Sequence, residues 1–394
     1  MKNRLKVDIY DKFVCIADRC SFSCCEGWDI LVDTDTYQKW ANSDASSYLC
    51  DNVRSRRVKK DTGYYMKLER GKHCPFLRED NLCNMVVTQG EECLPKTCRE
   101  FPRLIHRKDE CTEYSLSCAC PVVIDLLKEN AGLLQFTYEG DEDRGKGETL
   151  SGKLRDTMLF LLQHQSYTLR DRLLLIFQLL LTVREYADED HTGDMLTVKL
   201  AKVIEDYKEE EICSEIISLW SKVPFDTMDT LLERNELFLD IIQNYKTEKS
   251  YQGNLKAIDQ YTQNLEAEQL PPKFDRFVDK MRDYEQLLVN FLVTKVFAYC
   301  IQEELEALIM SYQMIVTEYV MVLHATYLRQ RIREDADKKK EIQRDSQVLY
   351  QELKEDMVLF SRIIGYNIAG MKEFWEDSFD EPVWEIGYLL LLLS

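Results

Sequence analysis

The cysteines of this chain are concentrated in its first third. Twelve of the 14 cysteines lie before residue 121, and four of them fall within the segment CIADRCSFSCCEGW (15–28). The first residues, MKNRLKVDIY, lack the apolar core of a secretory signal, so we expect a cytoplasmic chain whose thiols stay reduced. In that compartment a dense set of cysteines favours metal binding over disulfides. The sequence therefore predicts that bound metal replaces part of the hydrophobic core of this region.

Charge divides the chain at nearly the same place. Residues 1–125 carry 20 basic and 20 acidic side chains, so the whole net charge of −19 arises from residues 126–394. Beyond residue 121, apolar residues recur at helical spacing in one segment after another. We predict a mainly α protein with a cysteine-rich iron–sulphur or zinc domain of short, irregular elements over residues 1–130. An acidic α-helical bundle follows over residues 131–394.

Within the first domain, two segments predict local structure. DTDTYQKWANS (33–43) predicts a short helix that opens at an Asp or Thr cap, and GYYMKL (63–68) predicts an extended piece. In the second domain, LLLIFQLLLTV (173–183) is about half the ~20 residues that a bilayer span requires. We therefore expect a buried helix there and no membrane partner.

The net negative charge limits the classes of partner that the protein is expected to bind. A sequence-independent nucleic-acid binder needs a surplus of Lys and Arg, so we expect no nucleic-acid partner. A negative helical surface suits a partner protein that bears lysines, because it steers cationic partners. The same surface equally serves to keep a protein soluble.

The early cysteines form short motifs rather than a regular repeat. They read C-x4-C-x3-CC from Cys15, CPFL-x4-LC from Cys74, CR-x-FPR from Cys98 and CACP from Cys118. Structural zinc sites usually pair cysteines as C-x2-C, a spacing that this chain lacks. All-thiolate donors at uneven spacing suit an iron–sulphur cluster better, with zinc as the alternative.

Neighbouring side chains predict how such a site is supported. Arg99 and Arg103 follow Cys98 closely, and guanidinium groups there would offset the negative charge of a thiolate-bound cluster. His73 precedes Cys74, and we expect it to support the site rather than to bind metal. Cys213 and Cys300 lie in predicted helices, where we expect buried apolar residues.

The motifs together resemble the flagellin lysine-N-methylase family. The resemblance rests on F-x-C-I-x3-C-x3-C-C-x-G-W-x-I (13–30), C-P-F-L-x4-L-C (74–83), G-E-x-x-L-P-x-T-C-R-x-F-P-R (90–103), S-L-x-C-x-C-P (115–121) and YEQLLVNFLVTKVF (284–297). It implies a cytoplasmic enzyme that transfers a methyl group from S-adenosylmethionine to the ε-amine of surface lysines of flagellin.

The resemblance also implies an iron–sulphur cluster, taken as [4Fe–4S], held by shared cysteines. Carried over by position, these are Cys15, Cys20, Cys24, Cys25, Cys74, Cys83, Cys98 and Cys120. Eight cysteines exceed the four ligands of one cubane, so some serve elsewhere or there are two sites.

The chemistry of lysine methylation adds a constraint. Direct methyl transfer needs a neutral amine, whereas free lysine has a pKa of about 10.4. The site must lower that pKa by burial or supply an Asp, Glu or Tyr that accepts the proton. No G-x-G-x-x-G loop marks a methyl-donor pocket, so we expect the donor to bind beside the cluster at an open iron position.

These patterns leave the catalytic and donor-binding residues unassigned. They also leave a second class of protein open, a non-enzymatic metal-cluster protein whose centre is structural or redox-sensing. Its helices would bind a partner, and it would have no affinity for a methyl donor.

Overall fold

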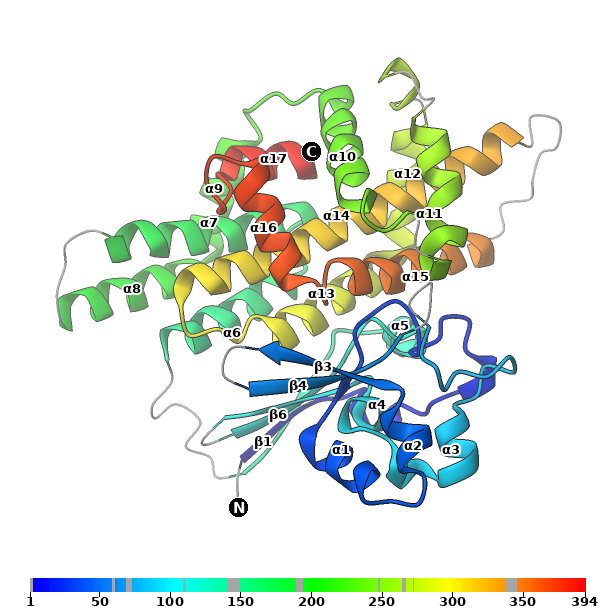
Figure 1. Cartoon of the computed structure of the whole chain (residues 1–394). Helices are drawn as coiled ribbons and strands as arrows, with labels where there is room; N and C mark the ends of the chain where they lie inside the picture. The colour runs from blue at the N-terminus through cyan, green and yellow to red at the C-terminus, as the bar shows by residue number, and fades with distance from the viewer. Residues whose placement is uncertain are drawn as a thin grey trace.

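Two small sheets and a large array of helices make up the protein (Figure 1). The computed structural model describes residues 3–58, 61–68, 73–108, 111–140, 149–188, 194–246, 249–263, 267–271, 273–336 and 346–394. Figure 1 shows the strands and the first four helices in its lower part and the helices from α6 onward above them. The mainly α prediction is confirmed.

The first sheet brings distant segments together. Its strands are β1 (Asn3–Val7), β5 (Arg103–Arg107), β6 (Cys111–Leu116) and β7 (Phe136–Glu139), in the order β5-β6-β1-β7. β1 runs parallel to β6 and antiparallel to β7. Successive side chains of β1 point to opposite faces of the sheet, so Leu5 and Val7 are buried and the residue between them lies nearer solvent.

The second sheet is smaller and lies among short helices. Its strands are β2 (Leu31–Val32), β3 (Val53–Val58) and β4 (Asp61–Met66), in the order β2-β4-β3. The helices are α1 (Thr34–Ala41), α2 (Ser46–Cys50), α3 (Asn84–Gln89) and α4 (Lys96–Glu100). Asp33 caps α1 and also accepts a 2.8 Å bond from the Lys96 backbone, so the predicted cap is confirmed. β4 likewise confirms the extended piece.

The remaining helices follow in chain order. They are α5 (Pro121–Glu129), α6 (Leu150–Leu162), α7 (Leu169–Asp188), α8 (Asp194–Asp206), α9 (Glu210–Trp220), α10 (Thr227–Ile242), α11 (Lys249–Thr262), α12 (Phe274–Met281), α13 (Glu285–Tyr299), α14 (Leu305–Ala336), α15 (Ser346–Ile363), α16 (Ile368–Ser378) and α17 (Ile386–Leu393). Short 3-10 turns are η1 (Tyr10–Lys12), η2 (Ala17–Arg19), η3 (Glu91–Cys93), η4 (Ala267–Gln269) and η5 (Arg282–Tyr284).

Two hydrophobic cores hold these elements. The larger core runs from Leu5 in β1 to Leu393 in α17, so the first sheet and α5 share it with the helical array. The smaller core belongs to the second sheet and its helices, around Trp40, Met66 and Phe76. The boundary between residues 130 and 131 stays a prediction.

α14 is the central helix of the array. By length and composition it is the one described helix that could cross a membrane, yet 72% of its most apolar window is buried inside the protein. It packs against α7, α10, α11, α13 and α15. Burial on several sides explains why its apolar residues follow no single stripe.

Candidate functional site

The eight cysteines carried over from the family resemblance lie near one another. Each interacts electrostatically with at least one other of the eight, although they come from separate segments of the chain. We call these eight the thiol centre: Cys15, Cys20, Cys24, Cys25, Cys74, Cys83, Cys98 and Cys120. The fold thus brings together side chains that the motifs only suggested were related.

Three neighbouring thiols form a row inside the thiol centre. Cys25 interacts with Cys24 on one side and with Cys74 on the other. The backbone follows the same path, since the Cys74 amide donates to the Cys25 carbonyl at 2.8 Å. The interaction with Cys25, together with burial, raises the pKa of Cys24 well above its usual value. Adjacent Cys24 and Cys25 therefore reach different neighbours.

Cys24 is also the link to the rest of the thiol centre. Cys20, Cys98 and Cys120 each interact with it electrostatically. Burial raises the pKa of Cys98 and of Cys120 to about 12. For Cys120, backbone amides in the first turn of α5 oppose that shift, because Cys120 is the residue that precedes the helix.

The other cysteines divide between the edge of this region and the helical core. Cys93 interacts with Cys83, while Cys50 ends α2 and Cys111 begins β6. Cys118 is fully enclosed. Cys213 and Cys300 are buried, as the helical pattern predicts.

The cation that faces the thiols is Arg362, the residue before the last of α15. Its guanidinium group donates to four backbone carbonyls in the two cysteine segments: Phe22, Ser23, Glu26 and Ala119, at 2.7–3.3 Å. It is 3% exposed, and its charge opposes the rise in the pKa of Cys20 and Cys24. Within the described part of the chain, no carboxylate pairs with it.

Neither Arg99 nor Arg103, the arginines that the sequence predicted to support the site, is the cation that faces Cys20 and Cys24. Arg99 is exposed, and Arg103 donates to the Phe13 carbonyl at 3.3 Å while lying over the Phe13 ring. Cys98 interacts with other thiols instead. The cation that interacts with Cys20 and Cys24 comes from α15, and the prediction that Arg99 and Arg103 offset the charge of a bound cluster stays a prediction.

The Gly-Trp pair of the first motif fixes the shape of the cysteine loop. Gly27 has φ +85°, and a Cβ there would lie 2.3 Å from the Tyr251 hydroxyl. That hydroxyl donates to the Gly27 carbonyl at 2.8 Å. Trp28 donates to the Cys24 carbonyl at 2.8 Å and stacks on Tyr366 from the end of α15. Both motif residues thus join the loop to the helical array.

His73 lies beside the row of thiols. Its Nδ1 is 3.0 Å from Glu26 Oε1, and Glu26 and His73 form an isolated bridge next to the Cys25–Cys74 contact. Its Nε2 is buried without a hydrogen-bond partner among the described groups. Its supporting role stays a prediction.

The donor chemistry of the thiol centre suits a soft metal or an iron–sulphur cluster. Its side chains are thiols from several segments, they neighbour one another, and a buried cation faces them. Over the residues that the structure describes, no three His, Cys, Asp or Glu side chains are grouped tightly enough to hold a metal ion. The thiols therefore fit such a group in their chemistry, whereas their spacing in this structure is wider than a bound metal requires.

A second polar centre also involves the last turn of α15. Lys295 Nζ of α13 is 2.7 Å from Glu318 Oε2 of α14, and Ser361 donates to Glu318 Oε1 at 2.6 Å. Both charged groups are about 1% exposed. We call this the buried ion pair. Burial raises the pKa of Glu318, and Lys295 opposes that rise.

Two tyrosines lie between the buried ion pair and the cysteine loop. The Tyr366 and Ser117 hydroxyls are 2.6 Å apart, and the Tyr299 hydroxyl is 3.5 Å from Ser117. Burial raises the pKa of both tyrosines far above the usual 10, so they remain protonated donors. Lys295 Nζ lies 5.4 Å from the centre of the Tyr299 ring, and Tyr366 stacks on Trp28 of the cysteine loop.

A cavity of about 40 Å³ opens onto the buried ion pair. It is lined by Lys295, Tyr299, Gln302, Ser311, Met314, Ile315, Glu318, Gly365 and Ile368. Ile368 is 59% exposed whereas Glu318 is fully enclosed, so the cavity runs from the surface to the charges. The catalytic residues that sequence analysis left unassigned have their best candidates here.

The sequence carried one signal for these residues. Lys295 lies in the run NFLVTKVFAY (290–299), and Arg362 lies in VLFSRIIG (358–365). A lone charge within a short apolar run of a helix is expected to be buried and partnered. The partners come from other helices, and no local pattern names them.

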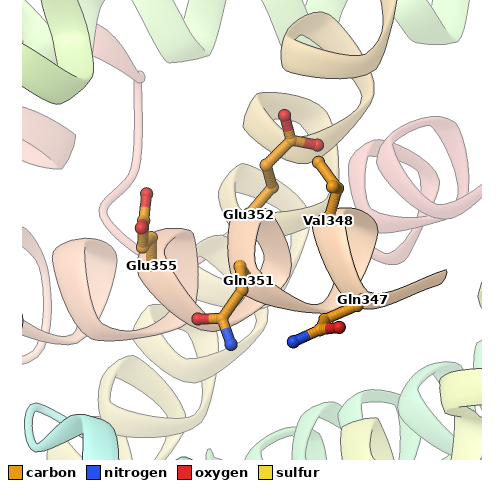
Figure 2. A pocket seen from close by; sticks show the side chains of 5 residues that line it. All are labelled: Gln347, Val348, Gln351, Glu352 and Glu355. Carbon is orange, nitrogen blue, oxygen red and sulfur yellow. The ribbon is translucent and has the colours of Figure 1, made fainter. Parts of the chain in front are cut away.

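A second hollow follows the exposed side of α15 (Figure 2). Figure 2 shows its lining, Gln347, Val348, Gln351, Glu352 and Glu355. All five come from one helix, so the hollow is shallow and gathers no groups from other elements. Glu352 differs from the rest, because burial raises its pKa to about 7 despite a 2.7 Å contact with Arg333.

Replacing Glu352 with Gln is expected to stabilise the protein at pH 8 and to change little at pH 4. The pKa is higher in the folded state than its usual 4.5, so folding favours the protonated form. That contribution is complete below pH 4.5 and is lost as the pH rises through 7. Gln keeps the neutral state, and we expect a gain of about 1 kcal/mol at pH 8. Urea unfolding at both pH values measures it, with Glu355→Gln as the control; equal effects of the two variants would contradict the assignment.

Comparison with known proteins identifies the family. The family model for the FliB lysine N-methylase C-terminal domain matches residues 155–392, more than half of the chain. The flagellar biosynthetic protein FliU of Salmonella muenchen is 35% identical over 115 residues, which is 28% of this chain and 68% of FliU. No solved structure matches the chain significantly.

Two relatives are named lysine-N-methylases. Those of Salmonella typhimurium and Salmonella choleraesuis are each 33% identical, over 116 and 115 residues. The matched part is 28% of this chain and 29% of either relative, so the chain spans less than a third of their length. The relationship expected from the cysteine motifs is confirmed by the match over α6 to α17, and the chain belongs to the FliB lysine N-methylase family.

Proposed function

We propose that this chain is a cytoplasmic protein-lysine N-methyltransferase that takes its methyl group from S-adenosylmethionine and modifies surface lysines of flagellin. Membership of the lysine N-methylase family supports the reaction, and the name of FliU supports a flagellar substrate. The single observation that carries the proposal is the thiol centre, where eight motif cysteines from distant segments neighbour one another and Arg362 of α15 binds the segments that carry them.

We propose further that the thiol centre holds an iron–sulphur cluster. Cys20, Cys98 and Cys120 each interact electrostatically with Cys24, and together with it they would supply four thiol donors, the number that one cubane needs. Cys25, Cys74 and Cys83 form a neighbouring row that would shield or support them. When bound, the cluster would supply an iron position for the amino and carboxylate groups of the methyl donor.

The residues of the chain itself have definite tasks in this scheme. Arg362 offsets negative charge on the thiolates and holds both cysteine segments by their carbonyls. Trp28 and Tyr366 cover the loop with stacked rings whose centroids are 5.2 Å apart. The acidic surface of the helices would attract a lysine-bearing partner, since the net charge of −19 belongs to residues 126–394.

Anaerobic purification with iron, sulphide and zinc analysis tests the cluster. We expect near-stoichiometric iron and labile sulphide with a broad visible absorption band. Cys24→Ser should lose both, whereas Cys213→Ser, a matched change of a buried cysteine in α9, should keep them. Zinc without a chromophore would contradict the iron–sulphur assignment.

Donor binding and flagellin methylation test the enzyme. We expect calorimetry to show affinity for S-adenosylmethionine and mass spectrometry to show a mass gain of methyl groups on flagellin lysines. A non-enzymatic cluster protein would bind metal but not the donor. That outcome would replace the proposed function.

A further inference from the structure

The cavity above the buried ion pair has the form of a site for an alkylamine. Met314, Ile315 and Ile368 give it apolar walls, and Lys295, Tyr299 and Glu318 are among its polar lining residues. A volume of about 40 Å³ exceeds the ~10–15 Å³ that one water needs. It accommodates an ammonium group and the methylene beside it, with the rest of an alkyl chain toward the surface.

Stability alone does not explain the buried ion pair. Enclosing two charges costs several kcal/mol per ion before their attraction repays it, and apolar replacements are often neutral or stabilising. Lys295 and Glu318 are nevertheless both about 1% exposed, in the middle of α13 and α14. A cavity with a few convergent polar groups and a carboxyl of shifted pKa is the usual form of a functional site.

We propose that this cavity binds the ε-amine of the lysine to be methylated and that Glu318 accepts its proton. The proposal rests on the proposed function for its reaction, although amine binding can be measured without it. Glu318 is the catalytic residue, because it touches the amine. Lys295 and Ser361 are positioning residues, because they act through Glu318.

Methyl transfer needs a neutral acceptor amine, and the cavity favours loss of the proton from a bound ammonium group. Burial away from water disfavours an ammonium ion, and a neighbouring cation disfavours it further, so both the walls and Lys295 lower the pKa of the guest. The N–H bond of the ammonium breaks, its electron pair stays on nitrogen, and the proton passes to Glu318. The nitrogen pair then forms the N–C bond as the S–C bond of the sulphonium donor breaks, with that pair left on sulphur.

The cavity and the thiol centre are connected through the end of α15 and the turn that follows it. Ser361 bonds to Glu318, and its neighbour Arg362 bonds to the cysteine segments. The Tyr366 and Ser117 hydroxyls are 2.6 Å apart, and Tyr366 stacks on Trp28 of the cysteine loop. Consecutive residues of one helical turn therefore contact both centres.

A bulky side chain at the entrance of the cavity tests the proposal without changing either residue of the buried ion pair. Ile368 is 59% exposed at the start of α16, so Ile368→Trp should fold and should obstruct entry. Val198→Trp, at an exposed position of α8, is the matched control. The probe is n-butylamine, with n-butanol as the uncharged comparison, and binding is measured by calorimetry.

We expect n-butylamine, but not n-butanol, to bind the unchanged protein and the Val198→Trp variant. Ile368→Trp should weaken that binding at least tenfold and should raise KM for flagellin at least tenfold, with S-adenosylmethionine affinity unchanged. Glu318→Gln should lower kcat instead. Equal KM values for the two tryptophan variants, or no binding of n-butylamine, would overturn the proposal.

The outcomes separate this inference from the proposed function. If flagellin is methylated normally by Ile368→Trp, the amine site is wrong and the methyltransferase stands. If n-butylamine binds and Ile368→Trp prevents that binding, but flagellin is never methylated, the proposed function fails and the amine site stands.

Discussion

Replacing Arg362 with Met is expected to lower the free energy of unfolding by about 3–5 kcal/mol, because it deprives four carbonyls of charged hydrogen bonds at once. Those carbonyls belong to residues 22–26 and to Ala119, so the change should also loosen the loop that carries Cys20, Cys24 and Cys25. Hydrogen exchange of the amides in residues 22–28 should accelerate at least tenfold. Urea unfolding and exchange mass spectrometry measure the two effects.

Two further variants show whether charge or geometry matters. Arg362→Lys keeps the positive charge but not the planar set of donors, so it should fall between the parent and Arg362→Met. Arg19→Met removes an exposed arginine near the same loop and should change little. If Arg362→Met unfolds and exchanges like Arg19→Met, Arg362 does not hold the cysteine loop.

Replacing Arg155 with Met is expected to cost about 3–5 kcal/mol at pH 7, because it leaves Glu113 charged and buried. Arg155 of α6 binds Glu113 of β6 through two hydrogen bonds, one of them 2.8 Å long. The two side chains are 7% and 5% exposed. The pair joins the first sheet to the helical array, so its loss weakens the contact between them.

The pH dependence of this variant follows from Glu113. Burial raises the pKa of Glu113, but the hydrogen bonds and charge of Arg155 outweigh burial and lower it below 4.5. This stabilisation is present above pH 4.5 in the parent and is lost as the pH falls through the lowered pKa. Without Arg155 burial dominates and the carboxyl protonates more readily. The cost of Arg155→Met should therefore shrink toward pH 4.

Urea unfolding, monitored by circular dichroism at pH 7 and at pH 4, measures the cost of Arg155→Met at each pH. Arg54→Met breaks a pair with Asp29 whose partners are both 49% exposed, and it should cost less than about 1 kcal/mol. Glu113→Gln combined with Arg155→Met should recover part of the loss, since no charge is left buried. A cost for Arg155→Met no larger than that of Arg54→Met would contradict the role assigned to the buried pair.

Local patterns predicted much of the fold, including the extended piece that becomes β4, and missed the first sheet. Helical periodicity in residues 173–183 anticipated α7, and Asp33 anticipated the start of α1, because both signals arise within a few turns of chain. β1 gave no such signal. It has five residues and pairs with strands that begin more than 100 residues later, and pairing at that distance leaves no periodic trace.

In the candidate site, too, residues that lie close together in sequence were predicted, whereas partners from distant segments were not. The cysteines could be assembled from their motifs, because each motif places several ligand-type residues close together in sequence. Arg362 is more than 240 residues from the Ala119 carbonyl that it binds, so the counter-charge was sought beside Cys98 instead. Lys295 and Glu318 meet only because α13 and α14 pack side by side.

The position of β1 has a consequence for the order of folding during synthesis. β1 is made before its neighbours β6 and β7, which begin at residues 111 and 136. Such long-range pairing is slow, because closing the intervening loop costs entropy before the contacts form. All eight cysteines of the thiol centre except Cys120 are therefore synthesised before β6 can close the loop, and we expect the cysteine segments to remain accessible on the ribosome until β7 completes the sheet.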